Sequence, residues 1–180
     1  IDGTDEQKSH TFADVVEIFI RANSGGTTLN KSDLMFTLLT SEWEEADVEM
    51  EDFLTEINDN DRFNFNRDFV LKTAMSVLDQ GAKYDVDKLR KPEVRKAIID
   101  NWAGISESIK FVKDQVVEKS FIRSGKALLS YNALIPLVYF HYHYKSSWVN
   151  IKSIKEYLLR SLLAGAFSGQ PDSLIDKINA

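Results

Sequence analysis

Apolar residues recur at spacings of three and four through most of the chain, which is the periodicity of amphipathic helices. The clearest case starts at Pro92, where proline suits the first turn of a helix because that turn needs no N–H donor. From there, apolar residues alternate steps of four and three down one face to about Ser120. They are Val94, Ile98, Trp102, Ile105, Ile109, Val112 and Val116. The pattern predicts one long helix whose apolar face, called the seam below, is buried in the core. The alternative is that the seam binds a second copy of the chain.

The same periodicity predicts seven further helices, and no alternating strand pattern interrupts them. Their expected ranges are 11–22, 31–40, 43–58, 66–78, 131–144, 150–168 and 171–178. Pro136 must either occupy the first turns of its helix or kink it, because its ring collides with the carbonyl four residues earlier. In the acid-rich helix 43–58, the residues expected to face inward are Val48, Phe53, Leu54 and Ile57.

The predicted fold class is therefore all-α, a multi-helix bundle of about seven to eight helices. We expect a single helical domain over residues 11–180 after a flexible polar tail at residues 1–10. A chain of 180 residues with 43% hydrophobic and 28% charged residues can bury one core of ordinary size.

Composition excludes several classes of site and of location. The chain has no cysteine, which excludes disulfides, thiolate metal sites and a cysteine nucleophile. No apolar run approaches the roughly 18 residues that a membrane span requires. No basic region followed by an apolar core marks a secretory signal. These features favour a cytoplasmic protein without membrane segments.

The net charge of −6 argues against a surface that coats DNA in general, because nonspecific affinity comes mainly from Lys and Arg neutralising phosphates. A local basic cluster is the candidate DNA contact, and the alternative is an ordinary solvated face. Its members are Lys88, Arg90, Lys91, Arg95 and Lys96.

The chain carries no recognisable catalytic or metal-binding set. His141 and His143 are two positions apart, which on a helix points them roughly 200° apart, so they do not share a metal. The polar turn beginning at Asp59 lacks the oxygen ligand and the glycine of a calcium loop. Neither a phosphate-binding Gly-x-x-x-x-Gly-Lys loop nor a Gly-x-Ser-x-Gly elbow occurs. We therefore predict no catalytic residue and no metal site within this chain.

The strongest candidate site is the glycine-rich bend between the first two predicted helices. Such a bend lets backbone approach a phosphate next to a helix N-terminus, and an arginine beside it can add a bidentate contact. The candidate phosphate- or nucleotide-binding residues are Arg21, Asn23, Gly25, Gly26 and Lys31. The alternative is a simple helix C-cap and turn in which Arg21 pairs with Glu17.

The same stretch resembles a known family. The positions that carry the resemblance are Phe19, Arg21, Asn23, Gly25, Gly26, Leu29, Ser32 and Asp33. With these positions, residues 16–38 resemble the signature of the N-terminal domain family of GmrSD-type, modification-dependent restriction endonucleases, and weaker similarity continues through residues 132–140 and 158–168.

Members of that family carry an upstream ParB-like subdomain whose Asp-Gly-Gln-Gln-Arg motif is implicated in nucleotide hydrolysis or nicking, and this chain lacks that motif. The resemblance implies a helical subdomain of a DNA restriction or defence protein, inactive alone, with Arg21 and Asn23 near the upstream pocket. It implies no cofactor in this chain, but a nucleoside triphosphate and a divalent metal in the parent protein. The implied partners are the ParB-like domain, DNA and an HNH-type nuclease domain or subunit. The alternative function is a noncatalytic helical scaffold for protein interaction.

Overall fold

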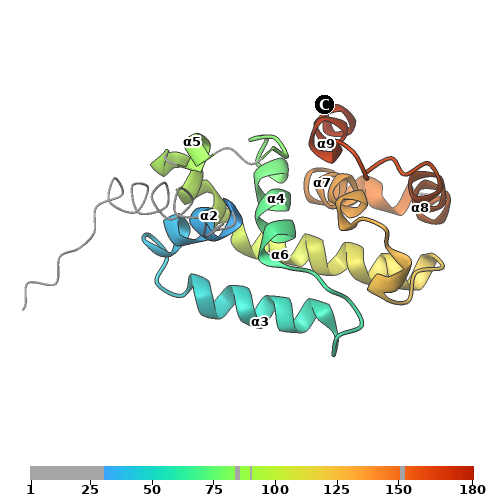
Figure 1. The fold of residues 1–180 in the computed structure, drawn as a ribbon, viewed down its shortest axis with the longest axis horizontal. Helices are drawn as coiled ribbons and strands as arrows, with labels where there is room; N and C mark the ends of the chain where they lie inside the picture. Colours follow the sequence, from blue (N-terminus) through green and yellow to red (C-terminus); the bar gives the residue numbers. More distant parts are fainter. Residues whose placement is uncertain (1–30, 84–85, 90, 151–152) are drawn as a thin grey trace, which may run out of the picture.

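The long helix α6 (Pro92–Lys119) runs through the middle of the fold, and most of the other described α-helices pack along it (Figure 1). This computed structural model describes residues 31–83, 86–89, 91–150 and 153–180. The expected helix 11–22 and the expected tail 1–10 lie outside the described residues.

The described residues are helical and contain no strand, so the all-α prediction is confirmed. The other α-helices are α2 (Lys31–Thr40), α3 (Ala46–Asn58), α4 (Arg67–Val77), α5 (Val86–Leu89), α7 (Ile135–His143), α8 (Ile154–Leu163) and α9 (Pro171–Asn179). Three short 3-10 turns are η1 (Gly125–Ala127), η2 (Tyr131–Leu134) and η3 (Lys145–Asn150).

The apolar seam of α6 lies inside the fold, as predicted. All seven of its residues are buried, and α6 contacts α3, α4, α5, α7 and α8. Ile105 at its centre has no exposed surface. Because the seam is already covered by helices of the same chain, it is not the surface for self-association that the sequence left open.

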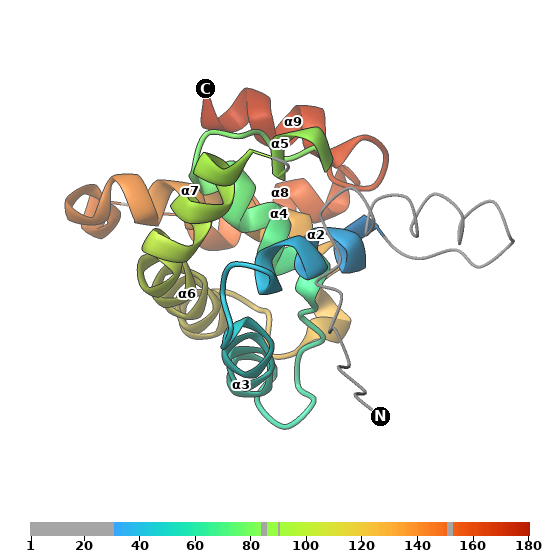
Figure 2. The same ribbon diagram turned by 90° about the vertical axis from the view of Figure 1, so that its left-hand side faces the viewer.

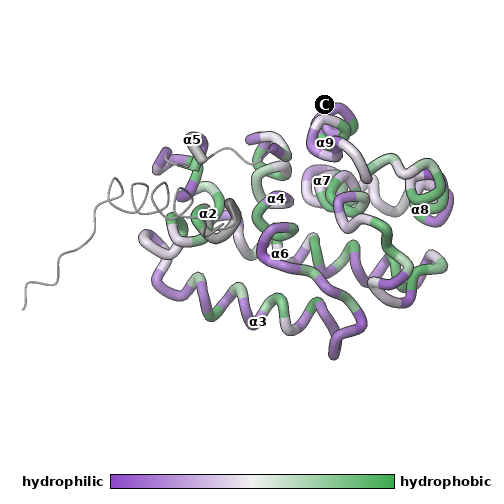
Figure 3. Tube along the Cα trace, in the orientation of Figure 1, coloured by the Kyte–Doolittle hydropathy of each residue, from purple (hydrophilic) through white to green (hydrophobic). Residues whose placement is uncertain are grey.

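Helix α3 runs alongside α6; the two are seen lengthwise in Figure 1 and end-on in Figure 2. Trp102 of α6 packs edge-on against Trp43 and Phe53, with ring centroids 5.2 and 5.5 Å apart. Edge-to-face aromatic pairs of this kind stabilise a core beyond the area that they bury. The hydropathy of α3 alternates along its length, as in an amphipathic helix (Figure 3).

The expectation that Val48 faces inward is wrong, because Val48 is 64% exposed. The buried face of α3 is formed by Ala46, Met50, Phe53, Leu54 and Ile57. Val48 lies two positions beyond Ala46, roughly 200° around the helix, and so projects from the opposite face.

Two predicted helices differ most from the structure. The stretch 131–144 divides into η2 and α7, and Pro136 sits in the first turn of α7, where its missing N–H removes no bond. The stretch 150–168 yields α8, which ends at Leu163, and Gly165 follows with a φ of 58°. That left-handed conformation suits glycine and ends the helix.

Candidate functional site

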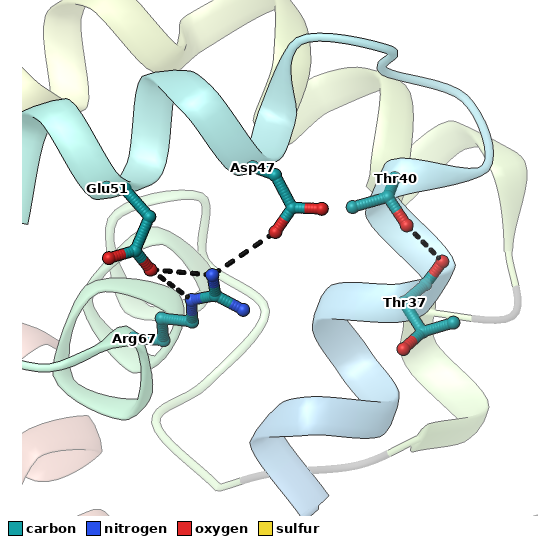
Figure 4. Close-up of polar contacts among 5 residues, drawn as sticks. All are labelled: Thr37, Thr40, Asp47, Glu51 and Arg67. Carbon is teal, nitrogen blue, oxygen red and sulfur yellow. Dashed lines mark hydrogen bonds and ion pairs between the residues drawn. The ribbon is translucent and has the colours of Figure 1, made fainter.

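Most of the predicted phosphate-binding bend lies outside the described residues, including Arg21, Asn23, Gly25 and Gly26. Lys31 is the first residue of α2, which packs against α4 and α5. The last turn of α2 is closed by the hydroxyl of Thr40, which donates to the carbonyl of Thr37 at 2.9 Å (Figure 4). The roles predicted for the bend therefore stay predictions, and the structure describes only the helix that follows it.

The predicted basic cluster lies at the same end of the fold. Helix α5, which carries Lys88, contacts both α2 and α6 (Figures 1 and 2). Lys91 directly precedes α6 and Lys96 lies near its start, so the three lysines lie on elements that pack together. Lys91 and Lys96 are exposed, and Lys96 lies 3.7 Å from a carboxylate oxygen of Asp100. The ammonium of Lys88 donates to the carbonyl of Gln80. Arg90 lies outside the described residues.

Arg95 does not fit the prediction of a DNA contact. It is only 7% exposed, its Nη1 donates to the carbonyl of Leu89 at 2.6 Å, and its Nη2 pairs with Glu42. The guanidinium thus joins α6 to the end of α5 and to the turn after α2. Arg95 follows the buried Val94 and therefore lies beside the seam of α6. The predicted cluster was defined by closeness in the sequence, which does not distinguish this buried side chain from the exposed lysines near it.

A second polar centre joins α2, α3 and α4 (Figure 4). Arg67, the first residue of α4, donates to Glu51 at 2.6 and 2.9 Å and to Asp47 at 3.2 Å. Its guanidinium also lies 4.2 Å from the ring centroid of Phe36 on α2, as in a cation–π contact. Arg67 therefore links α4 to both α3 and α2.

Beside Arg67 is an open groove of about 530 Å³ between α3, α4 and their connection. The connection bends through three consecutive left-handed residues, Asp59, Asn60 and Asp61. Asn58 holds it by donating to the carbonyl of Phe65 at 3.0 Å and accepting from its N–H at 2.7 Å. Among the described residues, no group of three histidines or acids is placed to hold a metal ion.

A smaller pocket of about 280 Å³ lies where the end of α4 meets α7 and α9. The phenol of Tyr139 donates to Asp79 at 2.9 Å, and the N–H of Ala82 donates to Asp176 at 2.6 Å. Burial and the neighbouring Asp79 raise the pKa of Tyr139 to about 12, so the phenol keeps its proton at neutral pH. The pocket is lined by Ser76, Asp79, Gly81, Tyr139, Asp176, Asn179 and Ala180.

His141 occupies an aromatic environment between α6, α7 and η3. Its ring stacks on Phe111 with centroids 4.1 Å apart and meets Trp148 edge-on at 5.4 Å. Burial lowers the pKa of His141, and the charge of Lys145 lowers it further, while Glu107 acts in the opposite direction. This histidine is a neutral member of the core at pH 7.

No protein-family model matches the chain, and no curated protein matches it either. In the part of the chain that the structure describes, no helix combines the length and the apolar character needed to cross a bilayer. The function is therefore argued below from the residues and their placement.

Proposed function

We propose that this chain is the helical subdomain of a GmrSD-like DNA restriction or defence protein of the cytoplasm. It supports nucleotide-dependent DNA nicking or restriction by a ParB-like part located upstream. One observation supports this proposal: α2, which follows the resembling bend, packs on α5, and α5 packs on the beginning of α6. Helix α2, which follows the predicted bend in the sequence, and the exposed lysines Lys91 and Lys96 therefore lie at one end of the fold.

In this proposal the bend forms one wall of a pocket that the upstream part completes. Arg21 contacts phosphate and Asn23 holds the shape of the bend, while Gly25 and Gly26 allow the backbone to turn. Lys91 and Lys96 attract the DNA backbone, since lysines lower the free energy of binding by neutralising phosphates. The nucleoside triphosphate and a divalent metal bind mainly to the upstream part, and an HNH-type nuclease is the partner.

The test is a titration of nucleoside triphosphate and of DNA, by calorimetry or fluorescence, on this chain and on a chain extended upstream. We expect binding by the extended chain, with nucleotide binding lost in Arg21→Ala. We expect the Lys91→Glu, Lys96→Glu double variant to weaken DNA binding and to reduce its dependence on salt. Lys155→Glu on α8, at the other end of the fold in Figure 1, is the matched control.

An unchanged nucleotide affinity in Arg21→Ala contradicts the role given to the bend. If Lys155→Glu weakens DNA binding as much as the double variant does, the effect comes from net charge and the proposed DNA surface is wrong. If neither chain binds nucleoside triphosphate or DNA, the whole proposal is wrong.

A noncatalytic scaffold is the second candidate function. Leu159 and Leu163 are one turn apart on α8 and are 42% and 80% exposed, so an apolar face remains uncovered within the described part of the chain. Exposed apolar patches commonly mark interaction surfaces. Light scattering and pull-down experiments test this reading, and a concentration-independent monomer that captures no partner contradicts it.

A further inference from the structure

The pocket between α4, α7 and α9 contains polar groups that the fold leaves without partners. Ser76 is only 3% exposed, and its hydroxyl oxygen has no hydrogen-bond partner among the residues that the structure describes. The side-chain oxygen of Asn179 is also buried without a partner. Both residues line the pocket. Because buried polar atoms in folded proteins are nearly always satisfied, two such atoms lining one cavity are available to hydrogen-bond a group bound there.

The pocket is rich in hydrogen-bond acceptors. Oδ1 of Asp79 accepts a bond from the phenol of Tyr139, and Oδ1 of Asp176 accepts one from the N–H of Ala82. Among the described residues no further hydrogen bond engages the other carboxylate oxygen of either residue, so both are available to a ligand. Asn179 adds an amide oxygen. A bound group must therefore bring several N–H or O–H donors and a positive charge.

One lysine lies at the rim of this pocket. A side chain built on Gly81 would place its Cβ 3.4 Å from both the ammonium of Lys88 and Oδ2 of Asp176. The ammonium of Lys88 is directed to the carbonyl of Gln80. Two carboxylates against one ammonium leave the site with a net negative charge, which favours a cationic ligand.

We propose that this pocket binds a monoalkylguanidinium group, either a free small molecule or an arginine side chain of a polypeptide. A guanidinium presents five N–H donors in a plane, which suits a pocket lined by two carboxylates, the amide oxygen of Asn179 and the hydroxyl oxygen of Ser76. It also stacks on aromatic rings, and Tyr139 lines the pocket. The groups present do not suit a metal ion, since no described cluster of three acids or histidines can hold one.

The proposal does not rest on the proposed restriction function, because none of the residues that line the pocket is among those proposed to bind nucleotide or DNA. The experiment is a titration of the chain with agmatine and with acetyl-arginine amide, followed by NMR. The neutral acetyl-citrulline amide has nearly the same shape as the arginine compound and is the ligand control. We expect saturable binding of the two guanidinium compounds and none of the citrulline compound.

The decisive variant is the double substitution Asp79→Asn, Asp176→Asn. Asparagine can still accept the bonds from Tyr139 and Ala82, and it tolerates the left-handed backbone of Asp79, whose φ is 56°. We expect an affinity at least about tenfold weaker, since charge-assisted hydrogen bonds are lost. Ser76→Ala tests the orphan hydroxyl separately, and we expect a smaller loss of affinity.

Asp61→Asn is the matched control, because Asp61 is also left-handed but lines the groove beside Arg67. We expect it to leave the affinity unchanged. The proposal is overturned if neither guanidinium compound binds, if the citrulline compound binds equally well, or if Asp61→Asn weakens binding as much as the double variant. Binding of acetyl-arginine amide without agmatine identifies the arginine side chain as the natural ligand, and the reverse identifies a small molecule.

Discussion

Gly125 is placed where no larger residue fits. A Cβ added there would lie 2.1 Å from the phenol oxygen of Tyr131 and 3.4 Å from the Cα of Phe63. Tyr131 is held in place, because its oxygen accepts a bond from the N–H of Asn64 at 2.7 Å and its ring lies 4.6 Å from that of Phe65. We therefore predict that Gly125→Ala displaces Tyr131 and destabilises the fold.

The magnitude follows from what the displacement breaks. Losing the bond from Asn64 costs about 0.5–1.5 kcal/mol, and overpacking costs about 1–3 kcal/mol. The lower entropy of the unfolded alanine chain offsets about 0.4–1 kcal/mol of this. We expect Gly125→Ala to lower the free energy of unfolding by roughly 2 kcal/mol, which for a chain of this size lowers Tm by roughly 4–8 °C.

The assay is a double-mutant cycle measured by chemical denaturation. Tyr131→Phe removes the phenol oxygen that the new methyl group meets, and alone it should cost about 1 kcal/mol through the lost bond to Asn64. In the double variant the methyl group no longer meets that oxygen, so the two changes should cost roughly 1–2 kcal/mol less than their sum. Additive effects of the two substitutions would refute the reasoning.

Two further predictions concern buried side chains. Arg95→Ala should lower the free energy of unfolding by about 2–4 kcal/mol, because it breaks a pair with Glu42 that is buried on the arginine side. The control is Lys96→Ala at an exposed position, which should change the free energy of unfolding by less than about 0.5 kcal/mol. Equal effects of the two substitutions in thermal denaturation would contradict a stabilising role for the Arg95–Glu42 pair. The folded-state pKa of His141 is lowered, so its unfolded state binds more protons and stability should fall as pH drops below about 6.5. His141→Phe, which keeps an aromatic ring against Phe111, should reduce that pH dependence in denaturation experiments between pH 5 and 7.5, roughly the range over which histidine titrates.

Much of the fold could be predicted because helical periodicity is a local signal. The helix 31–40 and the buried seam of α6 are set by neighbouring residues. The predicted start near residue 66 is also local, because the side chain of Asn66 accepts a bond from the N–H of Phe69. Helix α5 was missed because four residues are too few to show a period. The inward position of Val48 was wrong because apolar character was given more weight than its angular position on the helix.

The candidate sites were less predictable, because they depend on contacts between distant parts of the chain. The pocket proposed for a guanidinium group joins Ser76 and Asp79 to Tyr139 and Asp176, and no sequence motif relates those positions. Arg95 was grouped with exposed lysines because its partner Glu42 lies 53 residues away, so the local sequence gives no sign of the pair. A signal for the pocket would have required knowledge of how α4, α7 and α9 pack together, and a signal for Arg95 would have required knowledge of how α6 packs against the turn after α2.

The central position of α6 also determines how the domain opens. Its 28 residues extend roughly 42 Å and contact helices from both halves of the chain. Amide protons in the middle of such a helix exchange with solvent only when the whole domain unfolds. The exchange rates around Ile105 therefore report the global stability directly, and a protease cut in the connection after Lys119 would divide the core between α4 and α6 on one side and α7 on the other.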